Sequence, residues 1–312
     1  MSSHKKKQKL LSADSSGYRT PLKQVLYKFR RDKFALLGVL SFASIVLVVM
    51  IGPILSPYDP IRGDYSSLRL APSLVHPMGT DHLGRDVMTR VMVGGRYSMQ
   101  VGFGAILFAS TFGTVFGAIA GYTKKEIVDE LIMRSMDVLI SIPAIILGIA
   151  VLGILGTEPF DFGFWTIGNI QKLVFVIGLV YMPRFARVTR GAVLKERGKD
   201  YVTLARLEGA SHTRILISEI FPNITPPLLV LFSYRIGSAM IVAAALGFLG
   251  IGIQAPNPGW GVMLAQGREY LGAGDFWMIV FPGVALAATI ISINVIGDGI
   301  RDALDPDVLE NE

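Results

Sequence analysis

The chain has 312 residues, of which 51% are hydrophobic and only 17% are charged, so a large part of it does not face water. It contains no cysteine, which excludes disulfides, thiolate metal sites and cysteine nucleophiles in this chain, and its four histidines form no metal-binding motif. The net charge of +6 comes from basic residues beside apolar stretches, which favours membrane lipid over nucleic acid as the partner.

The first 33 residues are rich in Lys and Arg and contain too few apolar residues to fold alone. We expect them to form a cytoplasmic basic tail over residues 1–33. A secretory signal peptide is the alternative interpretation, but its basic region would be unusually long for that purpose. We therefore favour an uncleaved first membrane span.

Six apolar stretches are long enough to cross a membrane, because about 20 helical residues span a hydrocarbon core of about 30 Å. They cover residues 34–55, 99–122, 136–156, 173–193, 228–253 and 276–300. We expect an all-α integral membrane protein with an extracytoplasmic loop over 56–98, a five-helix core over 99–305 and a C-terminal tail over 306–312. The second span contains Gly113 and Gly117, a G-x-x-x-G pair that permits close packing of helices.

The distribution of Lys and Arg sets the expected orientation. Most of them fall in the segments that lie inside the cell if the N-terminus is cytoplasmic, so we expect both termini in the cytoplasm of a bacterial-type plasma membrane. Arg235 is the one clear charge inside a predicted span. Two interpretations remain open: it snorkels or pairs with a neighbouring chain's acid, or it lines a translocation path.

The polar segment over residues 194–222, here called the coupling segment, predicts a helix, a turn and a second helix. Asp200 opens the first helix, and Gly209 suits the left-handed position that closes it. Ser211 caps the second helix, and Pro222 ends it before the fifth span.

The first of these helices has a face of small side chains at Val202, Ala205 and Gly209. Such a face would let the surface of another protein approach the helix backbone closely. The spacing alone favours an ordinary amphipathic connector over such a contact face.

The stretch 201–223, YVTLARLEGASHTRILISEIFPN, resembles the EAA loop of ABC importer permeases, E-A-A-x3-G-x9-I-x-L-P. Gly209 and Pro222 keep the spacing of the Gly and Pro of that pattern, and Ala205 matches its second Ala. Thr203 and Leu204 depart from its Glu and first Ala. Further departures are Glu219 for the Ile and Phe221 for the Leu.

Two further stretches resemble the dipeptide and oligopeptide permease family. One is HPMGTDHLGRDVMTRVMVGGRYSM at 76–99, and the other is LGFLGIGIQAPNPGWGVML at 246–264. The long first extracytoplasmic loop and the G-T-D-x-x-G-R-D sequence resemble the second, or C-type, permease of that family. Ala243 is a departure, since many relatives carry Glu there.

The resemblance implies a type I ABC importer permease fold with a cytoplasmic coupling helix. It implies a permease that pairs with a paralogous permease, two ABC ATPase subunits and an extracytoplasmic substrate-binding protein. The chain has no G-x-x-x-x-G-K-[ST] motif, so ATP and Mg would be held by the ATPase subunits; we expect no cofactor, metal or catalytic residue here.

The resemblance also implies roles for particular residues. The residues implied for ATPase coupling are Thr203, Leu204, Ala205, Gly209, Ala210 and Pro222. Those of the extracytoplasmic family segment are Gly79, Thr80, Asp81, Gly84, Arg85 and Asp86. Trp260, from the matching stretch at 246–264, joins Arg235, singled out above by its charge, as a residue of a possible translocation path.

Two rival functions are a secondary transporter that ATP does not drive and a membrane enzyme. The first usually shows internal repeats and ionisable residues at mid-membrane, and the chain has no clear repeat. The second would have to use the adjacent Ser211 and His212, but adjacent residues cannot form a catalytic triad with a third orienting group. Relatives of the family carry peptides, and others carry nickel or glutathione, so peptide is the expected substrate class.

Overall fold

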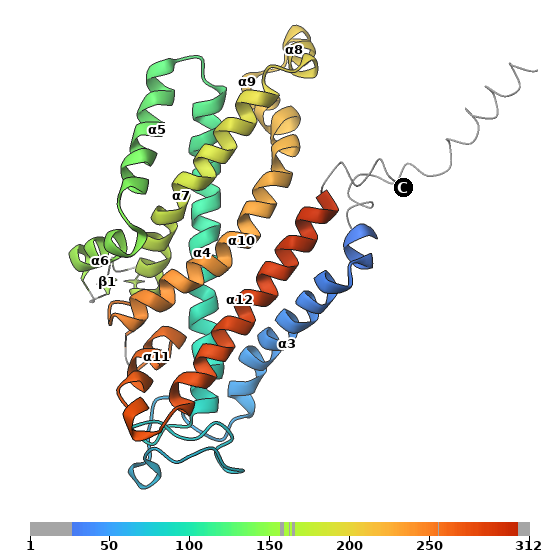
Figure 1. The fold of residues 1–312 in the computed structure, drawn as a ribbon. Helices are drawn as coiled ribbons and strands as arrows, with labels where there is room; N and C mark the ends of the chain where they lie inside the picture. Colours follow the sequence, from blue (N-terminus) through green and yellow to red (C-terminus); the bar gives the residue numbers. More distant parts are fainter. Residues whose placement is uncertain (1–26, 157–158, 162, 164–165, 255, 305–312) are drawn as a thin grey trace, which may run out of the picture.

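A computed structural model describes residues 27–156, 159–161, 163, 166–254 and 256–304 (Figure 1). The expected C-terminal tail and all but the end of the expected N-terminal tail lie outside these residues. The long helices are α3 (Lys33–Leu55), α4 (Val87–Tyr122), α5 (Glu126–Ser141), α6 (Ala144–Leu155), α7 (Asn169–Glu196), α10 (Phe221–Phe248) and α12 (Trp277–Leu304). The shorter elements are η1 (Tyr65–Ser67), β1 (Phe160–Asp161), β2 (Thr166–Ile167), α8 (Asp200–Leu207), α9 (His212–Arg214), the π-helical turn η2 (Ile215–Ile220), α11 (Trp260–Arg268) and η3 (Leu271–Ala273).

The described chain is helical apart from its loops and one small antiparallel hairpin, in which Phe160 pairs with Ile167 and Asp161 with Thr166. The expected helical class is therefore confirmed. Figure 1 shows α4, α7, α10 and α12 side by side as the body of the molecule, with α3 along α12.

Among the described residues, four helices are long and apolar enough to cross a membrane, or five if the bent pair α5–α6 forms one span. The four are Lys33–Leu55, Val87–Tyr122, His212–Phe248 and Trp277–Leu304. The expected number was six. The missing one is α7, whose Lys172, Arg184 and Arg187 lower its apolarity, although it packs along α4.

The second helix starts earlier than expected, at Val87 instead of residue 99, which shortens the loop to residues 56–86. Basic residues interrupt the apolar pattern before residue 99, but the fold satisfies them. Arg90 is almost fully buried and lies 3.3 Å from the carboxylate of Asp81, and the Nε of Arg96 donates to the carbonyl of Val49. Ionic and carbonyl partners thus let a helix begin where hydropathy alone predicts a loop.

The expected third span is broken. α5 and α6 meet at a 97° bend, at Ile142 and Pro143. Proline has no N–H to donate and disfavours helical geometry in the residue before it, and Ile142 is indeed extended with ψ 127°. This part of the chain therefore bends where an unbroken span was expected.

Glycines let α4 and α7 approach each other closely. A Cβ added at Gly113 would lie 2.5 Å from the carbonyl oxygen of Met182, and one at Gly117 would lie 2.3 Å from that of Ala186. Gly121 continues the stripe one turn further, against Arg190. The predicted close packing at Gly113 and Gly117 is confirmed, because any larger side chain would push the helices apart.

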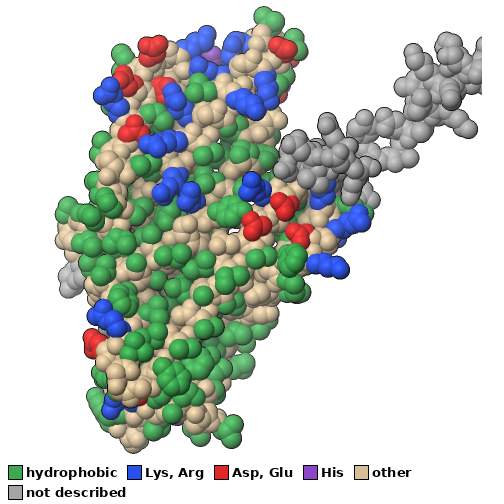
Figure 2. All heavy atoms as spheres, in the orientation of Figure 1, with side chains coloured by type: hydrophobic (Ala, Val, Ile, Leu, Met, Phe, Trp, Pro, Cys, Tyr) green, Lys and Arg blue, Asp and Glu red, His purple; other side chains and the backbone are tan. Residues whose placement is uncertain are grey.

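The loop of residues 56–86 and the helix α8 lie at opposite ends of the molecule (Figure 1). In Figure 2, charged side chains gather at the end that carries α8, and the band below that end is mostly hydrophobic. This distribution is the one expected of a protein that crosses a membrane.

Candidate functional site: the coupling segment and the loop cluster

The first helix of the coupling segment forms as predicted, as α8 from Asp200 to Leu207. Gly209 closes it with φ 82°, in the left-handed region, and the N–H of Ala210 then donates to the carbonyl of Ala205 at 3.0 Å. No atom lies within 4 Å of a Cβ added at Gly209. Glycine is therefore required at position 209 by the positive φ angle and not by crowding within this chain.

Two of the three residues of the predicted small-residue face point inward. Val202 is fully buried and Ala205 is half-buried against the rest of the chain, whereas Gly209 is exposed as predicted. The exposed face of α8 carries Thr203, Leu204 and Leu207, and the two leucines expose 59% and 79% of their surface. A partner protein that reached α8 would therefore meet leucine side chains as well as the backbone at Gly209.

A chain of hydrogen bonds links α7, α8 and α10. The hydroxyl of Tyr201 on α8 donates to Glu196 at the end of α7 at 2.7 Å, and the amide of Asn223 on α10 donates to that hydroxyl at 3.3 Å. Lys199 also contacts Glu196 at 2.8 Å. Burial and the Glu196 hydrogen bond raise the pKa of Tyr201 to about 12, so it stays a neutral donor.

The second predicted helix begins as expected, because the hydroxyl of Ser211 accepts from the N–H of Arg214 at 3.3 Å. Pro222, which is exposed, does not end it: the helix runs on from His212 to Phe248. The preceding turn is π-helical, and the N–H of Phe221 donates to the carbonyl of Leu216, five residues back. This wider turn accommodates the proline ring, so the helix is continuous through Pro222.

Two contacts tie the coupling segment to α4. The guanidinium of Arg197 donates to the carbonyls of Gly121 and Thr123, at 2.8 and 3.0 Å. The hydroxyl of Tyr122 lies 3.0 Å from Nδ1 of His212. Movement of α8 would therefore be felt by α4, α7 and α10 together.

At the other end of the molecule, the extracytoplasmic family segment forms a buried ionic cluster. Asp81 accepts from the Nε of Arg85 at 2.7 Å and lies 3.3 Å from the Nε of Arg90. All three side chains are at least nine-tenths buried. Arg90 also donates to the carbonyl of Pro60 at 2.7 Å.

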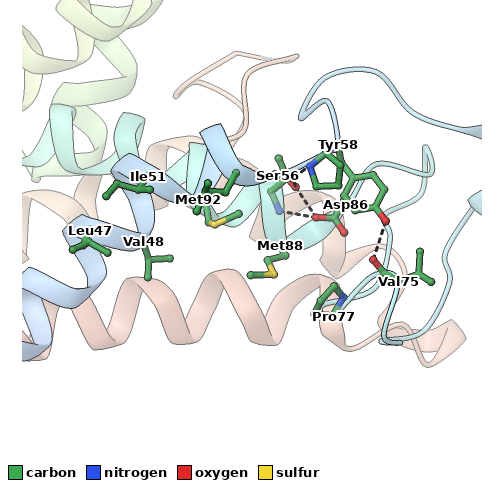
Figure 3. Close-up of a pocket in the computed structure, with 14 residues that line it drawn as sticks. Leu47, Val48, Ile51, Ser56, Tyr58, Val75, Pro77, Asp86, Met88 and Met92 are labelled. Atoms are coloured by element: carbon green, nitrogen blue, oxygen red, sulfur yellow. Dashed lines mark hydrogen bonds between the residues drawn. The ribbon is translucent and has the colours of Figure 1, made fainter.

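Asp86 holds the start of α4. Its carboxylate accepts from the N–H and the hydroxyl of Thr89, both at 2.7 Å, and lies 3.0 Å from Nδ1 of His76. An apolar groove of about 440 Å³ runs from the outer end of α3 to this carboxylate, and Tyr58 closes its polar end (Figure 3). Both oxygens of Asp86 are engaged, so it acts as a structural cap.

Gly79, Thr80 and Gly84 fix the loop backbone. Both glycines have positive φ, of 74° and 73°, and a Cβ at Gly84 would lie 1.9 Å from the carbonyl oxygen of Asp64. The carbonyl of Thr80 accepts from the indole of Trp277 on α12 at 3.0 Å. The loop is thereby fastened to the last helix.

Trp260, predicted as a residue of a translocation path, is fully buried. Its indole donates to the carbonyl of Val91 at 2.9 Å, and its backbone N–H donates to Ser98 at 3.1 Å. The ring packs where Gly95 leaves room for it. Its side chain thus joins α11 to α4.

Arg235 lies at the middle of α10 and faces the bundle, half-buried, near Tyr181 and Arg184 of α7. Arg184 holds a similar position along α7, fifteen residues after its start at Asn169.

The sequence interpretation missed the residues that connect the site. Tyr201, Glu196 and Asn223 were not singled out, because no motif marks a hydrogen-bond chain across three helices. Arg184 and Arg90 carry a signal that is visible in the sequence, a basic residue inside or beside an apolar stretch: Arg184 lies within the predicted span 173–193, and Arg90 lies within the predicted loop 56–98.

Comparison with known proteins gives the family. Residues 113–310 match the binding-protein-dependent transport system inner membrane component family, and residues 20–72 match the N-terminal TM domain of oligopeptide transport permease C. The chain is 36% identical over 287 residues to the dipeptide transport system permease protein DppC of Alkalihalophilus pseudofirmus, covering 92% of this chain and 90% of that protein. It is 37% identical over 291 residues to the glutathione transport system permease protein GsiD of Escherichia coli, covering 93% and 92%.

The fold is also that of a solved transporter. A chain of the MetNI methionine ABC transporter in its inward-facing conformation superposes with a TM-score of 0.56 at 19% identity, covering 70% of this chain and 98% of that chain. Members of this family are permease subunits that work with ATPase subunits and a substrate-binding protein, and are not themselves enzymes. The chain belongs to the family of binding-protein-dependent transport system inner membrane components, as a multi-pass permease subunit of an ABC importer.

Proposed function

We propose that this permease imports short peptides. The supporting observation is the agreement of relatives that align over more than nine-tenths of the chain, whose names specify dipeptides, di- and tripeptides and glutathione. These solutes share amide bonds and free carboxylates. The test is ATP-dependent uptake of a labelled dipeptide by vesicles that contain the reconstituted complex and its binding protein. Uptake that is absent with ATP, or equal without it, would contradict the proposal.

The coupling segment is the part that receives the ATPase movement. α8 presents Leu204 and Leu207 outward, and its buried side is linked to α7 and α10 through Tyr201. A rigid contact on the leucines would therefore displace helices and not only a loop. Helices packed as closely as α4 and α7 switch between discrete arrangements, which suits alternating access. ATP and Mg belong to the ATPase subunits in this scheme.

The experiment for this role compares two variants, each of which places glutamate at exposed apolar positions. Leu204→Glu together with Leu207→Glu should leave the chain folded but reduce copurification of the ATPase subunits and abolish uptake. Ile127→Glu on α5, 80% exposed, is the matched control and should retain both. Normal copurification and uptake with the double variant would show that α8 is only a connector.

In the proposed orientation both termini and α8 lie in the cytoplasm and the loop of residues 56–86 lies outside, and the distribution of Lys and Arg supports this. The chain contains no cysteine, so single cysteines at Ser73 and Lys199 can report it. A membrane-impermeant thiol reagent on intact cells should label position 73 and not position 199. The opposite pattern would invert the topology.

The partner permease is a paralogue and not a second copy of this chain. The support is the match to permease C over residues 20–72, since the C designation implies a non-identical companion. Purification of the complex with a tag on this chain should recover a second, different permease. Recovery of two differently tagged copies of this chain in one complex would contradict the heterodimer.

A further inference from the structure

Arg184, Arg187 and Arg190 follow one another at intervals of three residues along α7, and the last two form ion pairs with acids of α5. The guanidinium of Arg187 lies 2.6 Å from Asp137 of α5, and that of Arg190 forms two contacts of 2.5 and 2.6 Å with Asp129 of α5. Both pairs lie on the part of α7 toward α8. The charge of this part of the helix is therefore balanced within the chain.

The remaining arginine, Arg184, has no acidic partner among the residues that the structure describes. It is exposed, and its only recorded contact is with the ring of Tyr181, at 5.4 Å from the ring centroid. Arg235 of α10 also has no acidic partner in the described chain, and its Nε is buried without a hydrogen-bond partner there. Arg184 and Arg235 lie on helices that pack against each other, α7 and α10.

Both residues lie at the middle of long helices. Arg184 is about 22 Å from the start of α7 and Arg235 is about 21 Å from the start of α10, by helical rise. Guanidinium groups that face lipid are unfavourable wherever they lie in the hydrocarbon, so we place both side chains toward a water-filled path or another chain.

We propose that Arg184 and Arg235, with Tyr181 beside them, form a station in the translocation path that binds the carboxylate of the transported solute. Two guanidinium groups supply the planar pattern of donors that matches a carboxylate. The anion for this pair comes from outside the described chain, because acids of α5 pair with Arg187 and Arg190 and none of the described acids pairs with Arg184 or Arg235. The inference rests on the proposed peptide substrate, since a peptide carries a carboxylate at neutral pH.

The test uses one labelled dipeptide in two forms, with a free and with an amidated C-terminus, and the complete reconstituted transporter. We expect Arg184→Met with Arg235→Met to lower uptake of the free acid by about tenfold or more, as expected for loss of a charge-assisted hydrogen bond. Uptake of the amide should change less than about twofold. Arg184→Lys with Arg235→Lys should restore part of the uptake of the free acid. Arg187→Met is the control and should affect both forms alike.

Each other result has a separate meaning. Equal uptake losses for the two forms, in a variant that still assembles, would overturn the carboxylate station and leave peptide import standing. Loss of the second permease from the purified double variant would show that the pair binds an acid of that chain, which also overturns the station. Import of neither form by the parent transporter would instead reject the proposed peptide substrate.

Discussion

The loop of residues 56–86 and the coupling segment lie at opposite ends of the molecule and satisfy their polar groups in different ways. In the loop, charges are buried and paired with each other, as Asp81 is with Arg85 and Arg90. In the coupling segment, a few hydrogen bonds through Tyr201 hold a helix whose leucines face outward. The first arrangement resists change, whereas the second leaves a surface for a partner and a direct link to the long helices.

The largest expected effect is the loss of Asp81. Asp81→Asn would leave Arg85 and Arg90 buried beside each other without a countercharge, and breaking a buried ion pair in this way costs about 3–5 kcal/mol. The free energy of unfolding in detergent, measured by denaturant titration, should fall by that amount. Asp59→Asn is the control, because Asp59 and Arg62 form an exposed pair. Equal stability of the two variants would show that the cluster is not the anchor of the loop.

The next largest effect is a difference in lost unfolding free energy between alanine substitutions at two glycines with similar backbone angles. Gly84 and Gly209 have φ of 73° and 82°, but a Cβ at Gly84 would collide with the carbonyl of Asp64, and one at Gly209 meets nothing. Gly209→Ala should cost about 1–2 kcal/mol from backbone strain alone. Gly84→Ala should cost more in the same unfolding measurement, because the loop must also move. A larger loss for Gly209→Ala would mean that the coupling segment is the more crowded region.

A smaller effect is expected for the hydrogen-bond chain across the coupling segment. Tyr201→Phe removes the donor to Glu196 and the acceptor for Asn223, which should lower the free energy of unfolding by about 1 kcal/mol. Uptake should fall more than this modest loss suggests, because the link between α7 and α10 is broken. Tyr27→Phe, in the part of the chain before α3, is the control. Full uptake by Tyr201→Phe would show that backbone contacts alone transmit the movement.

Much of this arrangement follows from the sequence, for reasons that differ between regions. The spans at α3 and α12 and the turn at Gly209 were predictable, because apolar length and the conformational freedom of glycine act locally. The early start of α4 was not predictable, because it depends on Asp81 and on carbonyls of other elements that neutralise or accept from Arg90 and Arg96.

The coupling segment shows the same limit on a smaller scale. The helix and its boundaries follow from local information, but the direction of its faces does not: Val202 and Ala205, which were expected to meet a partner, pack inward, and only Gly209 of that face is exposed. Likewise, the indole of Trp260 could be placed in a motif but not in space, because its burial depends on Gly95 and Val91 of a distant helix. Faces and contacts are decided by tertiary packing.

The smallest expected effect is a difference in the pH at which the two regions loosen. His82 of the loop stacks on Tyr270, and burial lowers its pKa, with Arg85 and Arg90 acting in the same direction and Asp81 and Glu269 against it. Above pH 6.5 it is neutral whether the chain is folded or unfolded. On acidification the unfolded chain takes up the proton first, so stability falls as the pH drops below about 6.5.

In the coupling segment the corresponding group is Glu196. Burial opposes its charge, but hydrogen bonds from Lys199 and Tyr201 outweigh this and keep its pKa below the ordinary value of 4.5. Its contribution to stability is therefore present above pH 4.5 and is lost only as the pH falls through the lowered pKa. Between pH 7.5 and 5.5, the protection of amides from hydrogen exchange, taken relative to the intrinsic exchange rate at each pH, should fall around residues 76–86 and stay constant around residues 196–209. His82→Phe should remove this loss of protection, and its persistence in that variant would assign it to another group.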